Sequence, residues 1–85
     1  MSSYTVIWEK AARAGLKRLK DRDGEDAVRP LVHAINGLSR DPEPPGSSKL
    51  GANIRRLRVG RYRATYEIDG KRIAVQVLMV GSTRV

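Results

Sequence analysis

Residues 54–80 read IRRLRVGRYRATYEIDGKRIAVQVLMV, and this stretch decides the fold. It contains three β-rich runs, at 54–59, 62–68 and 72–80, which are separated by the pairs Gly60-Arg61 and Asp69-Gly70. Both pairs are typical of two-residue turns between antiparallel strands. The stretch therefore predicts two consecutive β-hairpins.

Two-residue turns fix which residues face each other across the hairpins. The register that they imply pairs Val59 with Tyr62, Leu57 with Ala64, Tyr66 with Ile73, Ala64 with Val75, and Tyr62 with Val77. All of these side chains lie on one face of the pleat, and a one-residue slip would place each on the other face. We expect this apolar face to be covered by the rest of the domain.

The residues before the hairpins supply that cover. YTVIW (residues 4–8) predicts a short strand, and small or apolar residues at helical spacing predict a helix from Glu9 to about Arg22. A second helix is expected to begin near Asp26 or Ala27, because Pro30 is tolerated only in a first turn. Its apolar stripe comprises Val28, Leu31, Val32, Ile35 and Leu38.

The second helix is expected to end at Asp41 and Pro42, and residues 41–53, rich in Pro, Gly and Ser, are interpreted as a passive linker. The predicted order is β-α-α-β-β-β. It indicates an α+β fold in which two helices pack on one face of an antiparallel sheet. With 85 residues, the chain has room for a single domain, 1–85.

Composition excludes several kinds of site. The sequence has no cysteine and one histidine, so disulfides and a Cys/His metal centre are excluded, and we expect neither a metal nor a cofactor. The absence of cysteine fits a reducing cytoplasm. No apolar run is long enough to span a bilayer, so no membrane partner is expected. Tyr62, Tyr66 and Trp8 are expected in the core.

Charge is distributed unevenly along the chain. Residues 1–45 hold eight basic and seven acidic side chains, a net charge of +1, whereas residues 46–85 hold nine basic and two acidic, a net charge of +7. Most of the second group are arginines, whose planar guanidinium suits phosphate. This imbalance favours nucleic acid as a partner over a merely solubilising surface.

The predicted register places polar side chains on the face of the hairpins that the helices leave open. They are Arg56, Arg58, Arg63, Thr65, Glu67 and Gln76. Arg58 and Arg63 stand directly opposite each other, an arrangement that destabilises a sheet, whereas Glu67 is expected opposite Arg72. We interpret the arginines as an anion site; the alternative is that they extend independently into solvent.

KLGANIRRLRVGRYRATYEIDGKRIAVQVLMVG (residues 49–81) resembles the signature half of RelE-type toxins of bacterial toxin–antitoxin modules. The specific part is R-x-L/V-R-x-G-x-Y-R-x-x-Y, present here from Arg55 or Arg56 to Tyr66. YTVIWEKAARAGLKRL (residues 4–19) is similar to the first strand and helix of that family. ParE-type gyrase poisons share this RelE-like fold.

The resemblance implies a ribosome-dependent mRNA endoribonuclease in the cytoplasm. Its catalytic residues would be Arg56, Arg58, Arg63 and Arg84, and its RNA-binding residues Lys49, Arg55 and Arg61. Thr83 occupies the place of the arginine near the family's C-terminus, and the tyrosine that follows in the family has no counterpart, so weak activity is expected. The implied partners are mRNA with the ribosome and a cognate antitoxin, with DNA contacted only through the antitoxin.

Two alternative functions remain open from the sequence. One is a catalytically inactive family member that binds its antitoxin and acts as a co-repressor. The other is a ParE-like gyrase inhibitor, which the shared arginine-rich hairpin does not separate from a nuclease.

Overall fold

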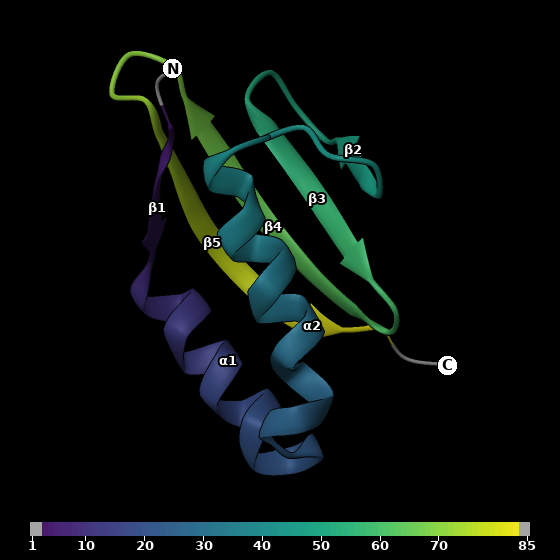
Figure 1. The fold of residues 1–85 in the computed structure, drawn as a ribbon. Coiled ribbons are helices and arrows are strands. Elements are labelled where there is room, and N and C mark those ends of the chain that lie inside the picture. The colour runs from purple at the N-terminus through teal and green to yellow at the C-terminus, as the bar shows by residue number, and fades with distance from the viewer. Residues whose placement is uncertain (1–2, 84–85) are drawn as a thin grey trace.

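The computed structural model describes residues 3–83, and two helices cover one face of a sheet in it (Figure 1). The elements are β1 (Thr5–Trp8), α1 (Lys10–Asp23), α2 (Glu25–Asn36), the 3-10 turn η1 (Gly37–Ser39), β2 (Ser47–Lys49), β3 (Ile54–Val59), β4 (Tyr62–Asp69) and β5 (Ala74–Ser82). The α+β prediction is confirmed.

The sheet has five strands in the order β1-β5-β4-β3-β2. The pairs β2–β3, β3–β4 and β4–β5 are antiparallel, but β1 runs parallel to β5, with Val6 beside Val75. The expectation of a wholly antiparallel sheet is therefore wrong. The helical hairpin returns the chain to the end of the sheet where β1 begins, while β2 lies at the opposite edge. As a result β3 and, after β4, β5 run in the same direction as β1 (Figure 1).

The first hairpin follows the predicted register. Val59 pairs with Tyr62 and Leu57 with Ala64 across the turn. Gly60 has a φ of 59°, which glycine adopts without the penalty that a Cβ would bring. The glycine therefore fixes a tight turn and with it the register.

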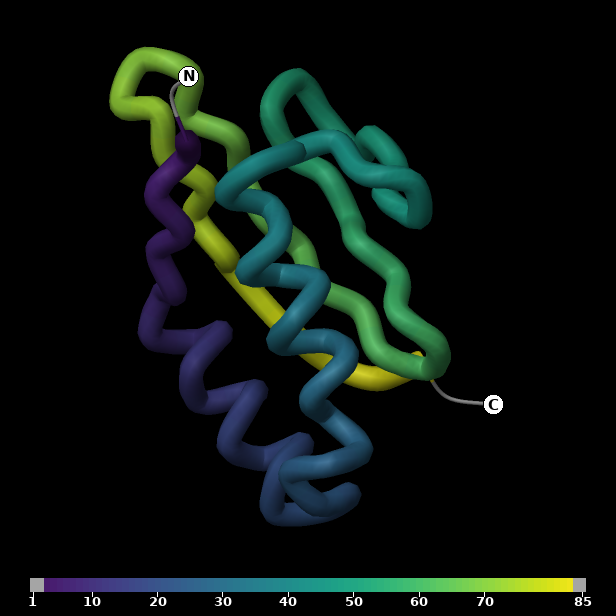
Figure 2. Tube along the Cα trace, viewed as in Figure 1, coloured from purple at the N-terminus to yellow at the C-terminus, as the bar shows by residue number. Residues whose placement is uncertain are grey.

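The second hairpin is longer than predicted. Tyr66 pairs with Val77, Ala64 with Val80 and Tyr62 with Ser82, so the expected partners Ile73, Val75 and Val77 are wrong. Residues 70–73 form a wider loop, seen in Figure 2 beside the N-terminus. The Asp69 carboxylate accepts hydrogen bonds from the backbone N–H groups of Lys71 and Arg72 and thereby stabilises this loop.

A second irregularity lies within β5. Thr65 pairs with Met79 while Tyr66 pairs with Val77, so Leu78 is an extra residue, a β-bulge. The bulge reverses which side chains of β5 face the helices from that point onward. Val75 and Val77 are buried before it and Val80 after it.

Helix α2 begins earlier and ends earlier than predicted. Gly24, with a φ of 89°, separates the two helices and lets α2 start at Glu25. Pro30 is then the sixth helical residue rather than part of the first turn, and it lies on the exposed side. Beyond α2, η1 carries Leu38 into the core.

The segment interpreted as a passive linker is held to the sheet. It contains β2, which pairs with β3 at the edge. The Tyr66 hydroxyl, from the buried side of β4, donates a 2.6 Å hydrogen bond to the Pro42 carbonyl. The segment is therefore part of the domain.

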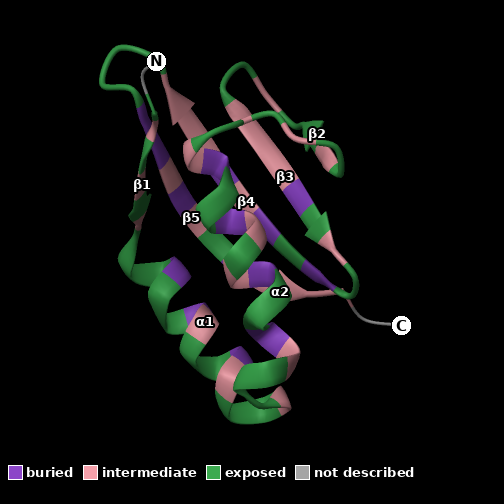
Figure 3. Ribbon diagram, in the orientation of Figure 1, coloured by how far each residue is buried: buried purple, intermediate pink, exposed green. Residues whose placement is uncertain are grey.

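The core lies between the helices and the sheet (Figure 3). Its buried members are Ala12 and Leu19 of α1, Val28, Leu31 and Ile35 of α2, Leu38, and Leu57, Tyr62, Ala64, Tyr66, Val75, Val77 and Val80 of the sheet. Trp8 is half-buried and packs against this cluster. The predicted placement of the aromatic residues on the helix side is confirmed.

Candidate functional site

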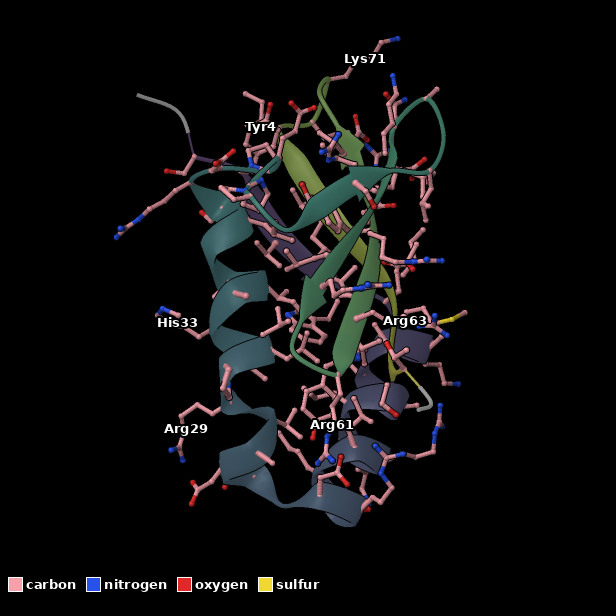
Figure 4. All side chains as sticks on the ribbon, turned by 90° about the vertical axis from the view of Figure 1, so that its right-hand side faces the viewer. Tyr4, Arg29, His33, Arg61, Arg63 and Lys71 are labelled. Carbon is pink, nitrogen blue, oxygen red and sulfur yellow. The ribbon has the colours of Figure 1, made fainter. Side chains whose placement is uncertain are left out.

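The open face of β3 and β4 carries three arginines, which we call the arginine face: Arg56, Arg58 and Arg63. Arg58 pairs directly with Arg63 across the hairpin, and both side chains are exposed. Arg63 projects on the side of the sheet away from α2, whereas His33 projects from the outer side of that helix (Figure 4). The tight turn at Gly60 produces this juxtaposition, because it fixes the β3–β4 register.

Among residues 3–83, no carboxylate forms an ion pair with any of these three arginines. The like charges at Arg58 and Arg63 are therefore not neutralised within the described fold. Opposite placement of like charges costs a few tenths to about 1 kcal/mol in a sheet. An anion bound between them would relieve that repulsion.

Arg56 precedes Arg58 by two residues on the same face of β3, and it lies between Ser48 of β2 and Thr65 of β4. Its side chain is only partly exposed, and its Nε is buried without a hydrogen-bond partner among the described residues. A buried donor without an acceptor is costly. Arg56 thus shares the arginine face, although its Nε is covered and only the rest of its side chain is partly exposed.

The polar neighbours of the arginine face lie on the same side of the sheet. Thr65, Glu67 and Gln76 are all half-exposed. Glu67 pairs with Gln76, so the expectation that it faces Arg72 is wrong. Arg72 lies in the wider loop, where it forms an ion pair with Asp69.

The other proposed site residues do not join the arginine face. Lys49 is exposed on the edge strand β2. Arg55 alternates with Arg56 and lies on the opposite side of β3, where its Nη2 donates to the Ser47 Oγ at 3.0 Å and its Nη1 lies 3.8 Å from Glu43. Arg84 lies outside the described residues.

Arg61 belongs to a separate cluster centred on Asp23, at the end of α1. The Asp23 carboxylate accepts hydrogen bonds from the Tyr62 hydroxyl at 2.7 Å and from two nitrogens of Arg22, and it lies 3.4 Å from Arg61. The Arg22 and Tyr62 hydrogen bonds hold the pKa of this carboxyl well below its usual range. Arg22 also donates to the Ser82 hydroxyl, so the cluster ties α1 to both β4 and β5.

Sequence patterns do not indicate this Asp23 cluster. In the sequence Asp23 contributes only to the signal that ends the first helix, because its partner Tyr62 is remote along the chain. The cluster also includes Arg61, the second residue of the turn, whose guanidinium lies 5.3 Å from the centre of the Tyr62 ring. Within the described residues, no group of three His, Asp or Glu side chains could hold a metal ion. No helix in that part of the chain is long and apolar enough to cross a membrane.

The comparisons with known proteins agree on one family. Residues 6–85 match the family model described as the ParE toxin of the type II toxin–antitoxin system parDE. A chain of the RelBE2 toxin–antitoxin complex from Mycobacterium tuberculosis is 32% identical, with a TM-score of 0.74 over 96% of this chain and 93% of that one. No curated protein matches in sequence.

Two more distant structures share the fold. A mutant of the E. coli RelE toxin in the free state is 16% identical, with a TM-score of 0.76 over 94% of this chain and 83% of that one. A chain of the chromosomal ParDE system of P. aeruginosa is 19% identical, with a TM-score of 0.76 over 96% and 98%. Taken with the family-model match over nearly the whole chain, these findings show that the protein belongs to the RelE/ParE family of toxins of type II toxin–antitoxin systems.

Proposed function

We propose that this toxin is a ribosome-dependent mRNA endoribonuclease that acts in the cytoplasm. The observation that carries the proposal is the Arg58–Arg63 pair, two exposed arginines that stand directly opposite each other in the hairpin register without a carboxylate partner in the described fold. Two arginines at this spacing suit a phosphate, because each can donate two parallel hydrogen bonds to its oxygens.

The reaction is an internal transesterification of RNA, which needs no cofactor. The 2′-oxygen of one nucleotide loses its proton and attacks the neighbouring phosphorus. The bond to the 5′-oxygen breaks, that oxygen takes up a proton, and a 2′,3′-cyclic phosphate remains. Additional negative charge develops on the phosphate oxygens as the new bond forms.

The arginine face supplies two parts of this catalysis. Arg58 and Arg63 would hold the phosphate and stabilise the developing charge, as fixed donors do in other phosphate-transfer sites. Arg56, which is partly exposed on the same face, would contact the adjoining phosphate or its ribose. Arg84 is proposed as a further cation at the same centre. An arginine side chain supplies positive charge and N–H donors but no general acid or base, so these residues contribute charge rather than proton transfer.

RNA binding beyond the scissile phosphate would involve Lys49, which is exposed on the edge next to β3. Arg55 and Arg61 were expected to share this role. Their contacts with Ser47 and Glu43, and with Asp23 and Tyr62, favour positions within the fold instead. We therefore assign Lys49 to RNA and expect a smaller contribution from the other two.

The proposed protein partner is a cognate antitoxin, as in the toxin–antitoxin complexes whose chains this fold resembles. An acidic antitoxin segment that covers the arginine face would neutralise Arg58 and Arg63 and exclude RNA at the same time. DNA would then be contacted only through the antitoxin.

Gyrase inhibition is the second candidate, because the matching family model is named for the ParE toxin. Expression of the chain without its antitoxin, followed by mapping of mRNA 5′ ends relative to ribosome positions, separates the two. Cleaved ends in the A-site codon that disappear in Arg63→Ala, but persist in the charge-matched control Lys71→Ala, are expected. Arrest with DNA breaks and intact mRNA would indicate gyrase, and tight antitoxin binding without arrest would indicate a co-repressor.

A further inference from the structure

The β-bulge at Leu78 places one apolar side chain on the open face. Before the bulge, Val75 and Val77 face the core. Regular alternation would send Met79 inward as well. The extra residue instead puts Val80 in the core, 5% exposed, and leaves Met79 61% exposed. Bulges often redirect a side chain beside a functional site.

Met79 lies next to the arginine face. It pairs with Thr65, which itself pairs with Arg56, so these three residues form a row across β5, β4 and β3. The next row is Gly81, Arg63 and Arg58. Met79 is therefore a diagonal neighbour of Arg63, at a typical spacing of about 7–8 Å, which long side chains can bridge.

The position directly opposite Arg63 has no side chain, because it is Gly81. A Cβ built there would meet no other atom within 4 Å, and Gly81 is not among the glycines with positive φ. Neither backbone conformation nor close packing therefore requires a glycine. The result is bare backbone bordered by Met79 and Arg63, with open space above it.

A single exposed apolar residue is ordinary on a protein surface. Met79 differs in its surroundings: it is the most exposed large hydrophobic residue among those described, and it stands beside arginines that no described carboxylate neutralises. A ligand that suits both features carries negative charge next to a flat apolar surface. Nucleotides have this combination, and the thioether of methionine makes favourable contacts with aromatic rings.

We infer that Met79 is a substrate-positioning residue, and that the nucleobase next to the phosphate held by Arg58 and Arg63 lies over Gly81 against the Met79 side chain. This inference rests on the proposed function for its substrate, single-stranded RNA. The contact is apolar and forms no hydrogen bond to the base edges. It therefore favours the larger purine rings over pyrimidines without reading a sequence.

The test compares the full-length protein and its variants in binding to a short single-stranded oligoadenylate and to an abasic strand of the same length, at low salt. Met79→Ala is expected to weaken binding of the base-bearing strand about two- to tenfold, the range typical of sulfur–aromatic contacts, and to leave abasic binding unchanged. Arg63→Ala should weaken both strands equally. Leu50→Ala, which removes another exposed apolar side chain, should change neither.

A second variant, Gly81→Leu, fills the space over the backbone and should also weaken binding of the base-bearing strand selectively. Thermal denaturation shows whether each variant folds. Equal binding of oligoadenylate by Met79→Ala and the parent would overturn the inference, as would an equal loss on both strands. Either result leaves the nuclease proposal standing, if Arg63→Ala still abolishes ribosomal cleavage.

Loss of antitoxin binding in Met79→Ala with unchanged RNA binding would assign the residue to the protein interface and refute a base contact. A parent protein that neither binds RNA nor cleaves it on ribosomes would refute both the inference and the proposed function.

Discussion

Arg58 of β3 lies directly opposite Arg63 of β4, with both side chains on the face that the helices leave open. The hairpin keeps this repulsive pair although complementary charge pairs occur elsewhere in the fold, as between Arg72 and Asp69. The repulsion costs a few tenths to about 1 kcal/mol of stability. Such a cost is expected at a site that binds an anion.

Arg63→Ala should therefore separate function from stability. The substitution removes an exposed side chain and relieves the repulsion, so the free energy of unfolding should stay constant or rise by up to about 1 kcal/mol. Growth arrest should disappear at equal expression. Urea denaturation and a growth assay of the same variant check the two halves. Undiminished toxicity would show that the arginine face is not the active centre.

Salt should strongly weaken RNA binding, because phosphate neutralisation releases counterions. Arg63→Ala should reduce the slope of log affinity against log salt by about 0.7, the value for one phosphate contact on a single strand. Lys71→Ala removes the same charge from the wider loop and should leave the slope almost unchanged. Titrations over a series of salt concentrations suffice. A slope equal in the parent and in Arg63→Ala would remove this arginine from the phosphate contacts.

The arginine face was predictable because one glycine fixes it. Gly60 needs a positive φ in a two-residue turn, so the first register, and with it the Arg58–Arg63 pairing, follows from local sequence. Asp69-Gly70 carries the same signal, but the Asp69 side chain caps a longer loop instead. In the second hairpin Tyr66 pairs with Val77 instead of the predicted Ile73, which is a shift by an even number of residues. An even shift keeps the same side chains on the buried face, so that face was assigned correctly between Tyr66 and the loop.

The position of Met79 was not predictable. Successive apolar residues in the run from Val77 to Val80 permit either alternation, and the bulge at Leu78 places Val80 rather than Met79 in the core. Asp23 was missed for a different reason: its contact with Tyr62, like the contact of its neighbour Arg22 with Ser82, forms only when α1 packs on the sheet. Sequence periodicity contains no information on such long-range polar contacts.

Asp23→Asn should lower the stability of the domain at neutral pH and make that stability less dependent on acidic pH. The folded-state pKa of Asp23 lies below the unfolded value of about 3.9, so its stabilising effect is complete above that value and is lost as pH falls through the folded-state pKa. The denaturation midpoint of the variant should lie below that of its parent at pH 7, and this difference should be smaller at pH 3 and continue to shrink at still lower pH. Asp26→Asn, at an exposed carboxylate, should leave the difference between the two pH values nearly intact.

Arg55→Ala should destabilise the domain, whereas Lys49→Ala should not. The Arg55 guanidinium is 17% exposed and joins Ser47 and Glu43 of the connecting segment to β3. Loss of its hydrogen bonds should cost roughly 1–2 kcal/mol, while Lys49 is exposed on the edge strand. Chemical denaturation measures both. An RNA-binding loss in Arg55→Ala without loss of stability would return this residue to the RNA interface.

Glycine to alanine should have opposite effects at two helical positions. Gly15 lies inside α1 against β5, and a Cβ there would be 2.8 Å from the backbone oxygen of Val80. Backbone cannot move aside as a flexible side chain would, so the steric overlap should cost about 1–3 kcal/mol. This cost should exceed the ~1 kcal/mol by which alanine stabilises a helix relative to glycine. Gly37 has a helical φ of −66° and no atom within 4 Å of such a Cβ. Gly37→Ala should therefore stabilise the domain by about 0.4–1 kcal/mol. Thermal denaturation of the two variants in parallel gives the signs directly. A stabilised Gly15→Ala would show that α1 can move away from Val80 at little cost, and that the contact between α1 and β5 is looser than the geometry indicates.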